Sequence, residues 1–553
     1  MSNLLPELLL LADAGSPGYE GLFTDFNTTL WSALLRMSLA MVAAAPFLVA
    51  GVFVAGILRG MVGAERTRRI LGVGHRSGPL RAWCLGILLP ICSLGALPVA
   101  RELRRAGVPS GTVISFVLVA PVLNPVSIIY GLSHIPLKML LYFALGTFLV
   151  SVGIGLLWNR LIAEKFDLQD QQYEKAPQAS RHRLAVAGHT AATTLVGPAA
   201  IDYGLALLAV GILGALLPHG ALQTGLTRDN VLAPVIMGVV AIPVYVTPTE
   251  VMMHFGLIVR DGFSLGAAFA LIVLGAGANV GVANWLRRDY GLKSLALFVG
   301  LLIGATLLIG FTADRTVMHG TAKVTDHTHA FDAFTRLPIV PTENANVTWI
   351  YRKIVQSMSP DRFWGLVLLC LVAIIGIGFR LAGGRISVDQ FLQRGIPDEK
   401  MQTTSNEDNA LSPIQLSIAG VCGVLVAATI GLYIFYPPMD TLIKDMNNIR
   451  VSTYDDIRAK NSDETIRRIA QWRSRLQKLP TSVVIRFGSV NAQRRERVNE
   501  SLYSLKTLEE YIRTGRFREA ETLIPYIEKQ YIACRNAFRR QQMQTLPEST
   551  TDP

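Results

Sequence analysis

Hydrophobic residues along this chain gather in long continuous blocks rather than alternating with polar residues. A block of about 18 apolar residues is long enough to cross the hydrocarbon core of a bilayer as a helix. About ten blocks reach that length. They are 32–58, 82–100, 111–133, 136–158, 202–218, 231–258, 263–286, 291–312, 363–384 and 413–436. The pattern predicts an all-α polytopic membrane protein.

The composition agrees with this fold class. Hydrophobic residues make up 51% of the 553 residues, charged residues only 17%, and the mean hydropathy is +0.38. Soluble chains of this size are rarely so apolar. Much of the net charge of +12 lies in loops beside the apolar blocks and in the C-terminal region. The positive-inside rule and anionic lipid account for such charge, so we expect contact with the bilayer and no nucleic-acid partner.

A short polar pattern occurs twice within the apolar blocks. The first copy runs from Gly107 through Gly111 to Asn124, and the second copy starts at Gly262 and ends at Asn279. The spacing from the first glycine to the second, and from the second glycine to the asparagine, is the same in both copies. Duplication around a polar residue at membrane depth is typical of transporters, whose sites lie between two repeats.

The two copies divide the chain into predicted domains. An N-terminal segment (1–31) precedes a first repeat (32–160), a polar linker (161–201) and a second repeat (202–312). A polar loop containing histidines (313–362), two extra transmembrane helices joined by a polar linker (363–436) and a soluble helical domain (437–553) follow. In the last domain, the sequence around Gly515 predicts a turn between two helices.

Basic residues predict the orientation of the first helix. Residues 1–31 contain no Lys or Arg, whereas 59–81 contain six arginines. The positive-inside rule therefore places the N-terminus outside and the first loop in the cytoplasm.

Three further arginines complicate this topology. Arg101, Arg104 and Arg105 would lie outside if 82–100 crossed the membrane completely. One solution is that 82–107 and 110–133 form broken helices or a re-entrant hairpin buried in protein. Four crossings in each half would make the repeats parallel and an odd number would make them inverted. The sequence leaves both arrangements open.

Two proline-containing segments interrupt the apolar blocks, at Leu89–Pro98 and Ile242–Glu250. Proline removes a backbone donor and frees a carbonyl group that protein, water or substrate must satisfy in lipid. A carboxamide adds a donor and an acceptor without the cost of a buried charge. We therefore expect a solute path at these segments and at the two asparagines, although ordinary kinks and interhelical hydrogen bonds are the alternative. The candidates are Cys92, Ser93, Asn124, Tyr245, Thr247 and Asn279.

Two ionisable residues lie one helical turn apart in a predicted span. Glu250 and His254 are candidates for coupling groups, because ionisable residues inside a membrane are usually functional. Since Arg260 and Asp261 follow closely, a position at the membrane edge is an equally good interpretation.

Metal binding and catalysis have little support. His327 and His329 are possible ligands in a polar loop, although histidines in such loops are more often solvated. Neither a nucleotide-binding motif nor a catalytic motif stands in a suitable context, so we expect no cofactor and no enzyme activity.

Three segments of the first half resemble a known family. Pro90–Ala100, Leu103–Val108 and Ala120–Ser127 are similar to the predicted permeases that include the organoarsenical exporter ArsP, and Ile242–Tyr245 and Ala276–Asn279 resemble its second-half motif. The resemblance covers about 30–312 and implies a multi-pass inner-membrane permease with duplicated halves. The exporters are thought to bind trivalent arsenic through cysteine thiolates. Here the run Cys92–Gly95 contains one thiol fewer than the exporters' run. Thr247, and not a cysteine, stands at the position of the second half that corresponds to Cys92.

Two functions from different classes follow. The first is a permease that moves a small solute, an organoarsenical or metal-like species among the candidates, by alternating access in the direction of export. The second is a membrane sensor or scaffold that has lost transport and acts through a protein partner of its C-terminal domain.

Overall fold

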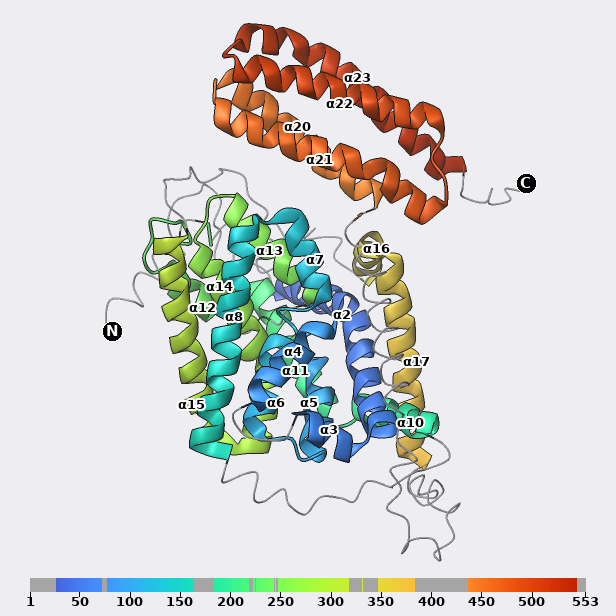
Figure 1. The fold of residues 1–553 in the computed structure, drawn as a ribbon. Helices are drawn as coiled ribbons and strands as arrows, with labels where there is room; N and C mark the ends of the chain where they lie inside the picture. The colour runs from blue at the N-terminus through green and yellow to red at the C-terminus, as the bar shows by residue number, and fades with distance from the viewer. Residues whose placement is uncertain are drawn as a thin grey trace, which may run out of the picture. The chain divides into compact units, whose positions relative to one another are not determined.

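The computed structural model consists of two compact units, Met1–Ala427 and Ala428–Pro553 (Figure 1). The structure describes residues 26–71, 77–163, 183–217, 222–223, 225–242, 244, 247–317, 331, 347–382, 436 and 438–544. Every regular element in these ranges is a helix, apart from one isolated bridge between Thr227 and Phe263.

Five helices of the first unit are long and apolar enough to cross a membrane, among the residues that the structure describes. They are α2 (Phe26–Ile57, extended by the π-helical turn η1, Leu58–Val62), α8 (Leu137–Trp158, extended by η2, Asn159–Ala163), α11 (Pro198–Leu216), α15 (Val280–Thr316) and α17 (Pro360–Ala382). Their outward faces carry exposed leucines and isoleucines such as Leu141, Leu308 and Ile374. Such faces suit lipid, and the prediction of a multi-pass membrane protein is confirmed.

Four predicted spans, 82–100, 111–133, 231–258 and 263–286, are not continuous helices. The short helices in their place are α4 (Gly78–Leu88), α5 (Ala96–Arg105), α6 (Ser110–Val119), α7 (Pro125–His134), α12 (Ala233–Ala241), α13 (Pro248–Arg260) and α14 (Leu265–Gly277). Helices of 9–13 residues extend only about 14–20 Å, which is about half to two thirds of a bilayer core. The broken-helix alternative is confirmed for the first half.

Prolines and glycines account for these breaks. Pro90 lies in the loop between α4 and α5, and Pro125 and Pro248 are the first residues of α7 and α13. Proline is favoured at that position because its missing N–H is not needed there. The predicted span 291–312 is the second part of α15, which bends at Gly291 (φ 83°).

The short helices form the interior of the first unit. Every residue of α6 and α14 is buried. Helix α6 packs against α4 and α8, α14 packs against α12 and α15, and α7 packs against α13. The backbone breaks therefore lie in protein rather than in lipid, where unsatisfied polar groups would be costly.

Three helices were not predicted: α3 (Ala64–Leu71), α10 (Arg183–Leu195) and α16 (Val347–Ser357). Helix α10 lies within the segment interpreted as a polar linker and packs against α2 and α17. Of the predicted span 413–436, the structure describes only Tyr436.

The second unit contains α20 (Met439–Arg458), α21 (Ser462–Phe487), α22 (Ala492–Arg513) and α23 (Phe517–Gln544). Trp472, Leu508 and Phe538 lie in a hydrophobic core of its own. The turn predicted around Gly515 is confirmed, and this glycine has the positive φ of 72° that a tight helix end favours.

Candidate functional site

Asn124 joins the two halves of a broken helix. Its side-chain oxygen accepts hydrogen bonds from the backbone N–H groups of Val126 and Ser127, both at 3.1 Å, and so caps α7. Its Nδ2 donates to the carbonyl oxygen of Ala120, just after α6, at 3.0 Å. The side chain is fully buried, so one amide satisfies backbone groups on both sides of the break.

Asn279 does the same at the second break. Its oxygen accepts from the N–H of Val282 at 3.1 Å and caps α15, while its Nδ2 donates to the carbonyl oxygens of Gly275 and Ala276 at the end of α14. It is also fully buried. In both places the carboxamide acts on the chain's own backbone, a role that the sequence interpretation had not separated from contact with solute.

The N-terminal ends of α6 and α14 are held by similar hydrogen bonds. The N–H of Gly111 donates to Oδ1 of Asn159, and the N–H of Gly266 donates to Oδ1 of Asp314, each at 2.9 Å. A side chain at either glycine would overlap a backbone carbonyl of the neighbouring helix, at Gly155 or at position 310. Gly111, Gly155 and Asn159 each lie 155 residues before their counterparts Gly266, Gly310 and Asp314.

The helices that provide these contacts run in opposite directions. Tyr142, near the start of α8, donates to the carbonyl oxygen of Ile309 near the end of α15. The ring of Trp158, at the end of α8, contacts Tyr290 and Phe298 near the kink of α15. Helix α6 therefore begins at one end of the α8–α15 pair, and α14 begins at the other.

The loops between the short helices contain the other predicted path residues. Cys92 and Ser93 are fully buried between α4 and α5, where the sulfur of Cys92 accepts from the N–H of Gly95 at 3.2 Å. Thr247, the residue before α13, is also buried, and its hydroxyl donates to Glu250 at 2.7 Å.

The structure describes only some of the remaining predicted site residues. Glu250 and His254 both lie on α13, with Glu250 in its first turn and His254 only 5% exposed. Tyr245, His327 and His329 lie outside the residues that the structure describes. No group of three or more potential metal ligands occurs among the described residues.

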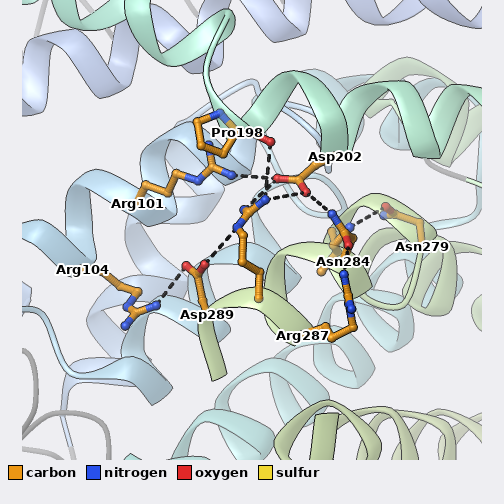
Figure 2. Close-up of polar contacts among 10 residues, drawn as sticks. Arg101, Arg104, Pro198, Asp202, Asn279, Asn284, Arg287 and Asp289 are labelled. Carbon is orange, nitrogen blue, oxygen red and sulfur yellow. Dashed lines mark hydrogen bonds and ion pairs between the residues drawn. The ribbon is translucent and has the colours of Figure 1, made fainter. Parts of the chain in front are cut away.

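A buried carboxylate is the main feature that the sequence interpretation missed. Asp202 on α11 is fully buried. Its Oδ2 accepts from Arg101 at 2.7 Å and from Arg288 at 3.1 Å, while Oδ1 accepts from Asn284 at 2.8 Å and again from Arg288 at 3.3 Å (Figure 2). The carboxylate thus joins α5, α11 and α15.

A second ion pair extends this network. Arg104 on α5 pairs with Asp289 on α15 at 2.9 Å, and its guanidinium lies 4.4 Å from the centre of the Tyr290 ring. Glu102 contacts Arg105 at 2.7 Å and Arg59, beyond α2, at 3.9 Å. We call this end of the first unit, where α8 and α5 finish, the basic end. The arginines that conflicted with a full crossing by 82–100 were the sequence signal for it.

Comparisons with known proteins agree with the membrane fold. A family model described as a predicted permease, ArsP_1, matches residues 30–314. The UPF0718 protein YcgR of Bacillus subtilis (strain 168) is 28% identical over 280 residues, which are 49% of this chain and 91% of the relative.

A second relative is named "Putative two-component membrane permease complex subunit", from Streptococcus mutans serotype c (strain ATCC 700610 / UA159). It is 22% identical over 174 residues, which cover 30% of this chain and 58% of the relative. No solved structure matches the chain.

Proposed function

Because this chain belongs to the ArsP_1 family of predicted permeases, we propose that it exports a small solute by alternating access between two halves. The observation that carries the proposal is the pair of broken helices, each joined by a buried asparagine at the same repeat position. Transporters bind their substrates at such interruptions, near the midplane of the bilayer.

The two halves are inverted copies in this proposal. Helix α2 corresponds to α11, the α4–α5 hairpin to the α12–α13 hairpin, and the α6–α7 pair to α14 with the first part of α15. Helix α8 corresponds to the second part of α15. A hairpin that enters and leaves on one side adds no crossing, so each half crosses three times, and the opposite directions of α8 and α15 support the inversion.

The solute path runs past the two hairpin loops. Cys92, Ser93, Tyr245 and Thr247 provide thiol and hydroxyl groups from these loops, while Asn124 and Asn279 keep the adjacent helix ends in place. Glu250 and His254 are the candidates for coupling groups. The proposed location is the inner cell membrane, with the basic end in the cytoplasm as the positive-inside rule requires.

The second unit is proposed to be a soluble domain that binds a protein partner. It lies outside the residues matched by the family model and has its own core. The relative named as a subunit of a permease complex also supports a partner. The sensor or scaffold function rests on this unit, and deletion of 438–553 distinguishes the two, because a permease would retain solute flux.

Efflux from cells with and without the chain tests the proposal. The panel contains trivalent organoarsenicals, arsenite and metal ions. Lower accumulation of one class, lost in the Asn124→Ala, Asn279→Ala double variant at equal expression, is the expected result. Unchanged accumulation of every solute would argue against export of these classes.

A further inference from the structure

The charged network lies between the helix breaks and the basic end. Arg101 is five residues beyond the start of α5, and Asp202 is four residues beyond the start of α11. At about 1.5 Å for each residue, both lie within two turns of a helix end. A solute moving from the hairpin loops to the basic end would have to pass this level.

The network contains the ion pairs that connect the two proposed halves at this level. Arg101 and Arg104 belong to the first half, whereas Asp202, Arg288 and Asp289 belong to the second. The side chain of Arg101 is 14% exposed, and that of Arg288 is 33% exposed. The two arginines are therefore partly exposed, while the carboxylate between them is fully buried.

Ion pairs suit a contact that must open. A buried ion pair gives little net stability compared with apolar packing, because both charges lose their hydration. When the helices separate, water can take the place of each hydrogen-bond partner of Asp202. Separating an apolar contact would instead expose apolar surface to water, which has a hydrophobic cost. The same contact can therefore close and reopen with a small difference in free energy.

The hairpin loop lies close to this contact. A Cβ atom at Gly281 of α15 would meet both the backbone carbonyl oxygen of Asp202 on α11 and the side chain of Leu94 in the α4–α5 loop. The loop that contains Cys92 is therefore packed next to the place where α11 approaches α15.

We propose that Asp202, together with Arg101 and Arg288, is the gate that closes the solute path at the basic end. This inference rests on the proposed permease function. In it, Asp202 is a positioning residue: it holds α5 against α11 and α15 in the closed state, and its ion pairs separate when that end opens.

Labelling of Cys92 from each side of the membrane tests the gate. The full chain would retain Cys92 alone, through Cys84→Ala, Cys370→Ala, Cys422→Ala and Cys534→Ala. A membrane-impermeant methanethiosulfonate reagent is added to inside-out vesicles and to intact cells. Asp202→Asn should raise the labelling rate about tenfold or more, and only from the basic end, because it weakens the closed state.

Matched variants separate gating from damage to the fold. Arg101→Gln should raise the labelling rate of Cys92 in the same one-sided way. Asp202→Glu keeps the carboxylate, so the labelling rate should stay as low as in the chain with Asp202. Glu65→Gln removes an exposed pair with Arg68 and should change nothing. If Asp202→Asn fails to fold, Arg101→Gln decides alone.

Equal acceleration from both sides, or no acceleration in either folded variant, would overturn the gate. The labelling needs no transported solute, so a failed efflux assay with one-sided labelling would argue against export of the solutes in the panel and leave the gate standing.

Discussion

The two proposed halves of the first unit share their backbone joints and differ in their charged groups. The N–H groups of Gly111 and Gly266 each donate to a side-chain oxygen, and Asn124 and Asn279 cap the helices that follow. Asp202, by contrast, pairs with arginines of both halves at the basic end. The comparison indicates that glycines and amides maintain the architecture of each proposed half, whereas the charges distinguish one end of the proposed path from the other.

The largest expected effect is at the charged network. Asp202→Leu would leave Arg101 and Arg288 without their shared carboxylate, and removing one partner of a buried pair costs about 3–5 kcal/mol. We expect a large drop in the thermal unfolding temperature in detergent. Glu65→Leu, at an exposed pair, should have little effect. Similar temperatures for both variants would show that Asp202 does not hold the helices together.

The close helix contacts should be equally sensitive in both halves. Gly111→Ala and Gly266→Ala each place a methyl group against a backbone carbonyl, which should destabilise by about 1–3 kcal/mol. Gly153→Ala and Gly300→Ala are matched controls, because a Cβ atom at either position meets nothing within 4 Å. These controls should be neutral or stabilising in thermal unfolding. Destabilisation by only one of the two glycine variants would contradict the proposed equivalence of the two halves.

Loss of either asparagine cap should have a smaller effect on stability. Asn124→Ala and Asn279→Ala should each cost about 0.5–2 kcal/mol, the range for helix caps. Asn124→Ser keeps a capping oxygen without a charge but loses the Nδ2 donor, so its stability should lie between wild type and alanine. Unfolding measurements that rank Ser below Ala would contradict the capping role.

The smallest effect on stability is expected at the position where one proposed half has a carboxylate, Asp314, and the other has an amide, Asn159. Asp314 and Asn159 accept the same backbone hydrogen bond at equivalent positions. Asp314→Asn should therefore change the unfolding free energy by less than about 1 kcal/mol, whereas Asp314→Leu, which lacks the acceptor, should cost about 1–3 kcal/mol. Equal losses in the two variants would mean that the charge itself is required.

The sequence predicted those parts of the fold that depend on local pattern. The spacing from Gly111 to Asn124 and its copy in the second half marked both helix breaks, and the apolar blocks marked the long helices. Hydropathy could not distinguish a crossing helix from two short helices joined end to end, because both are apolar throughout. For this reason 231–258 and 263–286 were each counted as one span, although the prolines of 242–250 and the repeated asparagine pointed to their breaks.

Long-range pairing explains what else the sequence concealed. Asp202 is separated from each of its arginine partners by more than 80 residues. At the start of an apolar block it was indistinguishable from a residue at the membrane edge. Only the folded chain brings α5, α11 and α15 together around it.

The central claim is that the two halves are inverted copies, because the proposed correspondence of their helices and the three crossings of each half depend on it. Arg160 and Arg315 are exposed and lie 155 residues apart, beyond the end of α8 and near the end of α15. The most direct test is labelling of Arg160→Cys and Arg315→Cys, each in a chain without other cysteines, with an impermeant reagent on intact cells and inside-out vesicles. Inverted halves predict reaction from opposite sides, with position 160 facing the cytoplasm. Reaction of both positions from the same side would contradict the account.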